Sequence, residues 1–149
     1  MKGSFSQEGH EGGQGKVWTG LSLRLAEDDA RGSKLGMSTI FSKIIAGKIP
    51  ARTAYEDDQC LAFHDIQPKA PVHVLIIPKK EIERITASTE QDQPLLGHLL
   101  FVAQKIAEEQ GLKESGFRLV INNGPDAGES VAHLHVHLLG GRALAWPPG

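Results

Sequence analysis

Three histidines alternate with aliphatic residues near the C-terminal end of this 149-residue chain, at positions His133, His135 and His137. A two-residue period is the period of a β-strand, so their side chains are predicted to project from one face of a single strand. The aliphatic residues between and after them would pack into a core on the other face: Leu134, Val136 and Leu138. This stretch therefore predicts a sheet with one packed face and one face that carries ionisable groups.

Three histidines on one strand face can serve as metal ligands or as acid–base and nucleophilic groups. A single histidine in a strand is usually satisfied or half-exposed, whereas three without another polar residue between them indicate a functional site. Neighbours on one strand face lie about 6.5 to 7 Å apart, so three of them span about 13 Å. The outer two would have to bend inwards to share one zinc ion, and Cys60 is the only cysteine available to help. We therefore favour an acid–base or nucleophilic site and keep a metal site as the alternative.

Composition and charge exclude several classes of function. With 149 residues, 40% of them hydrophobic, and a formal net charge of -2, the chain is large enough for one domain with one core. The chain has no run of basic residues of the kind that indicates a nucleic-acid binder. It also has no apolar run long enough to cross a membrane. The single cysteine, Cys60, permits no internal disulfide and favours a reducing compartment without indicating which one. We expect a cytoplasmic protein.

The first 36 residues differ in composition from the rest of the chain. They are rich in glycine, contain several acidic residues and lack the apolar region of a secretory signal. We expect residues 1–36 to be a disordered leader or extension and residues 37–149 to form one domain.

The spacing of apolar residues predicts an α+β fold with a five-stranded, mainly antiparallel sheet. A short helix that contains Ile40 and Ile45 would be capped by Ser38 or Thr39 and would end at Gly47. A long helix is predicted over residues 90–110. Four strands are predicted before the histidine-bearing strand: 51–56, 59–65, 72–77 and 117–121.

The residues of the histidine run resemble a known family. The stretch 133–139 looks like the signature of the histidine-triad (HIT) superfamily, in which histidine alternates with hydrophobic residues. The flanking segments 140–142 and 146–149 resemble the histidine triad nucleotide-binding branch. The resemblance runs from about Ser38 to Gly149 and includes four further segments: 55–58, 63–66, 70–73 and 77–80. It implies a HIT-like fold whose sheet continues across a homodimer through the long helix and a neighbouring strand.

The same resemblance implies a purine nucleoside phosphoramidase that acts on conjugates of AMP or GMP. His135 would be the nucleophile that attacks phosphorus and forms a nucleotidyl-histidine, which water then hydrolyses. His137 would donate a hydrogen bond to the phosphate oxygens, and His133 and His73 would orient and tune His135. Ser130 would assist the departing amine. This scheme requires no metal and no cofactor.

A nucleotide site is also implied by the resemblance. Asp65 follows a predicted strand and by itself would be read as an ordinary turn residue, but its counterpart in the family accepts hydrogen bonds from ribose hydroxyls. The implied nucleotide-binding residues are Ile40, Phe41, Ile44 and Ile49 at the base, Asp65 at the ribose, its neighbour Ile66, and Asn122, Gly128, Glu129, Ser130, His135 and His137 at the phosphate.

The sequence departs from the family at two positions. Many relatives carry glutamine where Glu129 stands and an aromatic residue where Ala132 stands. A Glu129 carboxylate facing the phosphate would repel it, whereas a backbone contact would be insensitive to the change. Two alternative functions are hydrolysis of dinucleoside polyphosphates or adenylylated metabolites, and a nucleotide- or zinc-binding adaptor with little turnover. The glycine pair and the Trp-Pro-Pro-Gly end point away from polyphosphate hydrolysis.

Overall fold

The computed structural model describes residues 39–149. The predicted leader, residues 1–36, therefore lies outside the described residues. The chain divides into two compact units, and each is presented by itself. Of the described residues, 39–52 and 130–132 belong to the first unit, and 53–129 and 133–149 belong to the second.

The first unit contains the predicted short helix, α3 (Ile40–Ile45). Thr39 caps its N-terminus: its side chain accepts from the Ser42 backbone N–H, and the Ser42 side chain accepts from the Thr39 N–H. Gly47 follows the helix with φ +78°, a left-handed conformation that favours glycine. The predicted cap at Thr39 and the predicted end of the helix are both confirmed.

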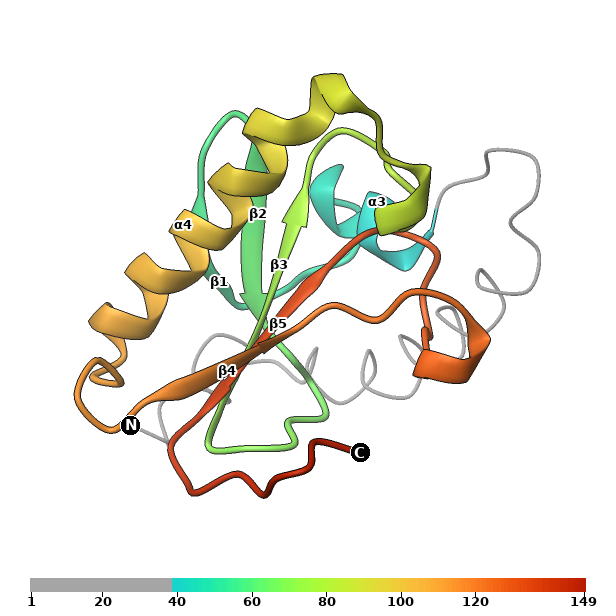
Figure 1. Cartoon of the computed structure of the whole chain (residues 1–149). Helices are drawn as coiled ribbons and strands as arrows, with labels where there is room; N and C mark the ends of the chain where they lie inside the picture. Colours follow the sequence, from blue (N-terminus) through green and yellow to red (C-terminus); the bar gives the residue numbers. More distant parts are fainter. Residues whose placement is uncertain (1–38) are drawn as a thin grey trace. The chain divides into compact units, whose positions relative to one another are not determined.

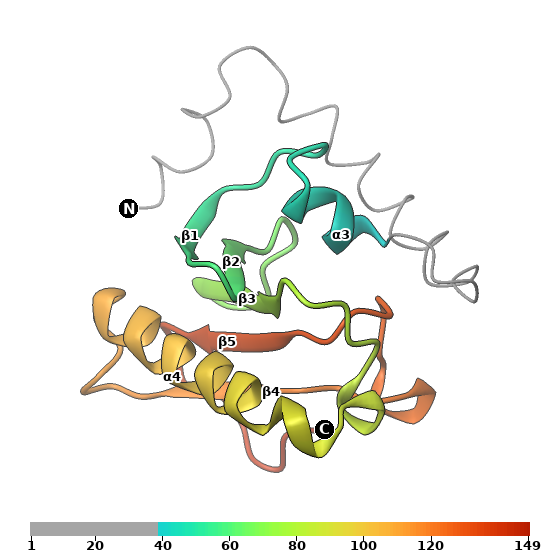
Figure 2. The ribbon, with the colours of Figure 1, turned by 90° about the horizontal axis from the view of Figure 1, so that it is seen from above.

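The second unit contains the predicted five-stranded sheet. Its strand order is β1-β2-β3-β5-β4, and all neighbouring strands are antiparallel (Figures 1 and 2). The strands are β1 (Thr53–Glu56), β2 (Cys60–His64), β3 (Val72–Pro78), β4 (Phe117–Val120) and β5 (Val136–Gly140). The α+β class and the antiparallel sheet are confirmed, and the ends of β1, β2, β3 and β4 lie within two residues of the predicted ones.

A long helix, α4 (Gln93–Glu109), lies across one face of the sheet (Figure 2). Its buried side chains, such as Leu99 and Ile106, pack in one cluster with Val74, Ile76 and Leu138 of the strands. Burial of this apolar surface is the main favourable term for the fold. No helix within residues 39–149 combines the length and apolar character needed to span a membrane.

The start of α4 corrects the prediction of a single helix from residue 90. A 3-10 turn, η4 (Glu90–Asp92), precedes it, and Pro94 lies in the first turn of the α-helix. Proline has no backbone N–H to donate, which is tolerated in that first turn because the N–H groups there have no partner in the helix. The long helix therefore begins three residues later than predicted.

The histidine run is also only partly a strand. β5 begins at Val136, so His137 lies within it whereas His133 and His135 precede it. The Leu134 backbone N–H donates to the Ile82 carbonyl at 2.7 Å, which ties the approach to β5 to the segment after β3. The prediction of three histidines on one regular strand is wrong in this respect. The predicted packing is confirmed, because Leu134 and Leu138 belong to the core cluster.

Candidate active site

Histidines from β3 and β5 meet on the sheet face opposite α4. Val74 and Leu138 pair across the two strands and pack in the core beneath α4. Side chains alternate along a strand, so His73 and His137 point to the opposite face. Their rings meet there, with His73 Nε2 3.0 Å from His137 Nδ1. The His135 ring packs against the His137 ring, with 4.9 Å between the two ring centroids. Three of the predicted residues therefore gather here.

The His135 ring is held by the backbone. Its Nδ1 lies 2.7 Å from the carbonyl oxygen of His133. A carbonyl oxygen can only accept, so Nδ1 carries the proton. In the neutral ring Nε2 then carries the free lone pair, so Nε2 is the atom that can act as a nucleophile.

The His133 ring has a different partner. Its Nε2 lies 3.0 Å from the carbonyl oxygen of Pro78, at the end of β3. The sequence suggested that the His133 side chain orients His135. The structure shows a contact to the His135 ring from the His133 backbone carbonyl, and the His133 ring anchors that segment to β3. The orienting role of the His133 side chain stays a prediction.

His73 and His137 form a directed hydrogen-bond chain. The Lys69 backbone N–H donates to His73 Nδ1 at 3.0 Å, so the neutral His73 ring carries its proton on Nε2. That proton is donated to His137 Nδ1, which leaves the His137 proton on Nε2. His137 therefore presents an N–H donor, as a ligand for phosphate oxygens requires. The direct partner of His73 is His137 rather than His135.

Burial favours the neutral form of all four rings. Burial lowers the pKa of His73, His133 and His135 below the ordinary value of 6.5. Burial also lowers the pKa of His137 to about 4, and the neighbouring His135 and His73 act in the same direction. A neutral imidazole retains both an acceptor and a donor nitrogen, so this electrostatic environment preserves the arrangement described above.

Asp65 has two roles in the structure. Its Oδ1 accepts from the Gln67 backbone N–H at 2.9 Å, as a turn residue does. Its Oδ2 lies 3.4 Å from His73 Nε2. The carboxylate thus belongs to the histidine group, and the neighbouring Ile66 is exposed.

The predicted phosphate loop is a short 3-10 turn, η5 (Pro125–Ala127), followed by Gly128 with φ +82°. The Gly128 N–H donates to the Pro125 carbonyl, and the Glu129 N–H donates to the Gly124 carbonyl. Both predicted phosphate donors therefore have partners within the loop, and a phosphate would have to share or replace them. Asn122 is half-buried at the start of this loop.

Glu129 is paired with an arginine that the sequence did not single out. Arg84 Nε lies 3.0 Å and 3.1 Å from the two carboxylate oxygens of Glu129, and Arg84 Nη2 lies 2.8 Å from one of them. This two-pronged contact neutralises the charge that was predicted to repel phosphate. The pair is separated by 45 residues, so no local pattern in the sequence indicates it.

The other predicted site residues belong to the first unit. Ile40, Phe41 and Ile44 are buried, Ile49 is half-buried and Ser130 is exposed. Their assignment to the base and to the leaving group remains a prediction.

Within the described residues, one group at this site could hold a metal ion. Asp65, His73 and His137 place their ligand atoms within 4.8 Å of one another. The three histidines of the run do not converge in this way in residues 39–149. A metal at Asp65 would have to displace the hydrogen bond between His73 and His137.

The chain is similar in sequence and in structure to proteins of one family. Residues 46–144, which include all four histidines of the site, match the family model of the HIT domain. An uncharacterized HIT-like protein from Synechocystis sp. is 58% identical over 111 residues, or 74% of this chain and 96% of the relative.

Solved structures agree with this similarity. A HIT family hydrolase from Legionella pneumophila is 50% identical, with a TM-score of 0.72 over 73% of this chain and 97% of that one. A histidine triad nucleotide-binding protein from Candida albicans is 34% identical, with a TM-score of 0.64 over 74% of this chain and 83% of that one.

Proposed function

The chain belongs to the HIT-domain family, and from this membership we propose that it is a purine nucleoside phosphoramidase. Its substrates would be conjugates in which an amine is bonded to the phosphorus of AMP or GMP. The names of two relatives, a HIT family hydrolase and a histidine triad nucleotide-binding protein, support hydrolysis and nucleotide binding. The purine preference rests on the resemblance alone.

The observation that carries the proposal is the fixed state of His135. Its Nδ1–H donates to the His133 carbonyl, and burial lowers its pKa. Both effects keep the lone pair on Nε2 at neutral pH, so the ring is ready to attack without first losing a proton.

The reaction has two steps. His135 Nε2 bonds to phosphorus as the bond between phosphorus and nitrogen breaks, and the leaving amine takes up a proton from solvent. Water then attacks the nucleotidyl-histidine, which releases the nucleoside monophosphate and restores His135. The sum is substrate plus water giving monophosphate plus amine.

The other residues support this sequence of steps. His137 Nε2–H would donate to a phosphate oxygen and stabilise the charge that develops there. His73 holds His137 in the donor state, and Asp65 would accept from the ribose hydroxyls. Ser130 would assist the departing amine, a role taken from the resemblance.

We also propose a homodimer and a cytoplasmic location. Leu100 and Phe101 on α4 are exposed, and Phe117 of β4 is exposed at an edge of the sheet. Exposed apolar groups on adjoining elements are typical of interfaces. A second copy pairing along β4 would continue the sheet. The single Cys60 supports a reducing compartment.

The test is hydrolysis of adenosine 5'-phosphoramidate by the full chain, with and without a chelator. We expect turnover that the chelator does not change, and an acid-labile nucleotidyl adduct on His135 by mass spectrometry of quenched enzyme. His135→Ala should lower the rate by roughly a thousandfold or more, about 4 kcal/mol of transition-state stabilisation, with far less effect on AMP binding.

Three results would reject the proposal or its assignments. Absence of turnover with tight AMP binding would favour the adaptor function. Activity restored only by stoichiometric zinc would favour a catalytic metal. An adduct on His133 or His137 would overturn the choice of nucleophile.

A further inference from the structure

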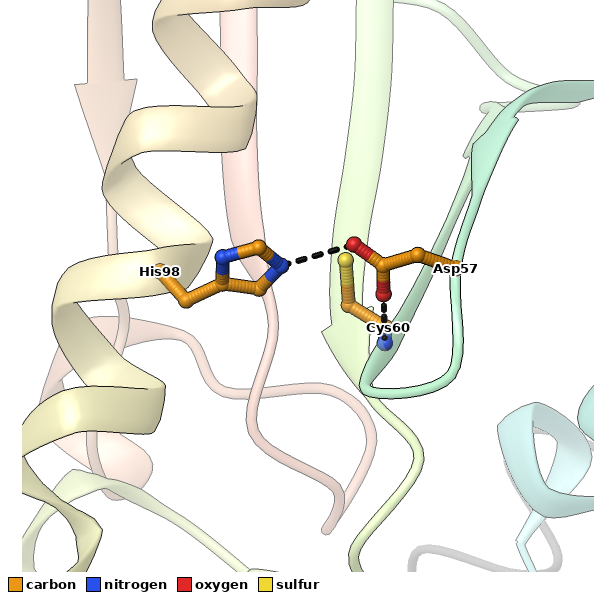
Figure 3. Close-up of side chains that lie close together, drawn as sticks. All are labelled: Asp57, Cys60 and His98. Carbon is orange, nitrogen blue, oxygen red and sulfur yellow. Dashed lines mark hydrogen bonds and ion pairs between the residues drawn. The ribbon is translucent and has the colours of Figure 1, made fainter.

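A second group of ionisable side chains lies on the α4 face of the sheet. Asp57 comes from the turn between β1 and β2, Cys60 begins β2, and His98 lies on α4 (Figure 3). Their ligand atoms, an Asp57 oxygen, Cys60 Sγ and a His98 ring nitrogen, all lie within 4.8 Å of one another. None of these residues contributes to the proposed hydrolysis.

Asp57 is fixed so that one oxygen faces the other two residues. Its Oδ1 accepts from the backbone N–H groups of Gln59 and Cys60, both at 2.8 Å. Its Oδ2 accepts from His98 Nε2 at 2.7 Å and from the Tyr55 hydroxyl at 3.0 Å. Burial acts to raise the pKa of Asp57, but the hydrogen bonds from His98 and the two N–H groups outweigh it and hold the pKa below its usual range.

Cys60 is enclosed, whereas its two neighbours remain partly in contact with solvent. Its exposed fraction is 0%, and those of the His98 and Asp57 side chains are 27% and 22%. Burial, followed by the charge of Asp57, raises the pKa of the Cys60 thiol to about 12. The thiol is therefore protonated at neutral pH unless a cation compensates the thiolate.

We propose that Asp57, Cys60 and His98 form a binding site for a divalent transition metal of the zinc class, with solvent as the fourth ligand. Thiolate, imidazole and carboxylate are the three ligand types that zinc takes in proteins. Tetrahedral bonds of about 2.0 to 2.3 Å place two ligand atoms about 3.3 to 3.6 Å apart. The Asp57 and His98 atoms must separate by less than 1 Å to reach that distance.

Metal binding proceeds by exchange of protons for the ion. The Cys60 thiol loses its proton to solvent and binds as thiolate. His98 Nε2 releases to solvent the proton that it donates to Asp57, and the ring binds the metal as a neutral imidazole with one proton on Nδ1. The Tyr55 hydroxyl stays bonded to the carboxylate and orients it, as partners of metal ligands commonly do.

An ion pair between Asp57 and His98 is the simpler explanation of part of this geometry, because it would by itself fasten α4 to the turn. That explanation assigns nothing to the sulfur, since a buried cysteine is then only a small apolar group. Figure 3 shows the sulfur directed toward the Asp57 carboxylate, beside the contact with His98. The two explanations differ in one respect that can be measured, namely whether the thiol becomes a thiolate ligand.

The test is titration of the metal-free, reduced full-length protein with Co²⁺, followed by absorption spectroscopy. The chain has one cysteine, so a near-ultraviolet thiolate-to-cobalt charge-transfer band can come only from Cys60. We expect that band at one equivalent of Co²⁺, its displacement by Zn²⁺, and release of the thiol proton. His98→Asn should weaken Co²⁺ binding at this site by about tenfold or more, because even outer partners of metal ligands typically contribute that much.

The matched control is His64→Gln, which removes a histidine from the same strand as Cys60 but outside the group. It should leave the band and the affinity unchanged. Cys60→Ser should abolish the band, and Asp57→Asn provides a second variant that keeps the turn's acceptor if the serine variant fails to fold. Two results would overturn the proposal and leave the ion pair as the full explanation. One is binding of Co²⁺ without the charge-transfer band, and the other is a His98→Asn variant that shows the band and binds Co²⁺ with unchanged affinity.

Discussion

The pairing of Arg84 with Glu129 predicts that substitutions of these two residues change the affinity for AMP in opposite directions. The proposed phosphate site carries the Glu129 carboxylate, which is paired with the Arg84 guanidinium, and the same guanidinium also contacts Glu83 at 2.7 Å. Glu129→Gln removes the anion and leaves the Arg84 cation, so AMP should bind more tightly. Arg84→Met removes the cation and leaves the Glu129 anion, so AMP should bind more weakly.

The expected magnitudes follow from the burial of the pair. The Glu129 side chain is 9% exposed and that of Arg84 is 30% exposed, so the contact lies between a surface pair and a buried one. A surface pair contributes about 0 to 1 kcal/mol, and breaking a buried one costs about 3 to 5 kcal/mol. We expect a coupling free energy of about 1 to 2 kcal/mol in unfolding. A unit charge about 4 Å from a phosphate charge in water-like surroundings would change AMP binding by about 1 kcal/mol, about fivefold.

The assay is a double-mutant cycle with both single variants and the Arg84→Met/Glu129→Gln double variant. Urea unfolding gives the coupling, and calorimetric AMP titration at low and high salt gives the effect on binding. The two single variants should move affinity in opposite directions, the double variant should return near wild type, and salt should shrink all the differences. Affinity that stays constant at low salt in both single variants would refute the reasoning and would place the pair away from the phosphate.

Further predictions concern pH, the leader, the dimer and the anchoring histidine. Because burial lowers the pKa of both His135 and His137 below 6.5, turnover should not decline as the pH falls from 7 to 6.5 and should fall only at lower pH, in initial rates corrected for acid hydrolysis. Between pH 6.5 and pH 4 the unfolded chain binds protons that the folded site does not, so the free energy of unfolding should fall with falling pH. A turnover rate that halves at pH 6.5 would contradict the expectation for turnover. Deletion of residues 1–36 should leave fold and rate nearly unchanged, and a several-fold loss of rate in a folded protein would show that the leader belongs to the site. Sedimentation equilibrium at micromolar concentration should find a dimer that Phe101→Glu weakens, whereas a wild-type monomer would reject the interface. His133→Ala should cost about 1 to 3 kcal/mol of stability, since it leaves the buried Pro78 carbonyl without the ring's N–H; urea unfolding unchanged from wild type would disprove that anchoring role.

Much of the fold could be predicted because its signals are local. The cap at Thr39 and the left-handed glycine after α3 each depend on residues within a few positions. Alternation of apolar residues placed Leu134 and Leu138 in the core correctly. The start of β5 could not be predicted in this way, because it depends on a backbone hydrogen bond from Leu134 to Ile82, which is distant in sequence.

The chemistry of the site was less accessible to sequence, because partners far apart in the chain determine it. Arg84 lies 45 residues from Glu129, and His98 lies 41 residues from Asp57. Neither contact leaves a periodic pattern. The structure places His98 half-buried against the Asp57 carboxylate.

The states of the histidines depend on backbone groups that every sequence possesses. The Lys69 N–H sets the tautomer of His73, and through His73 it sets the donor atom of His137. The His133 carbonyl sets the tautomer of His135 by the same rule, because a carbonyl accepts and cannot donate. The residue type thus provides the imidazole rings. The backbone conformation before β3 and before β5 determines which nitrogen of each ring attacks or donates. The irregular backbone before β5 therefore has a chemical consequence, since in a regular antiparallel pair the His133 carbonyl would point along the sheet to a neighbouring strand.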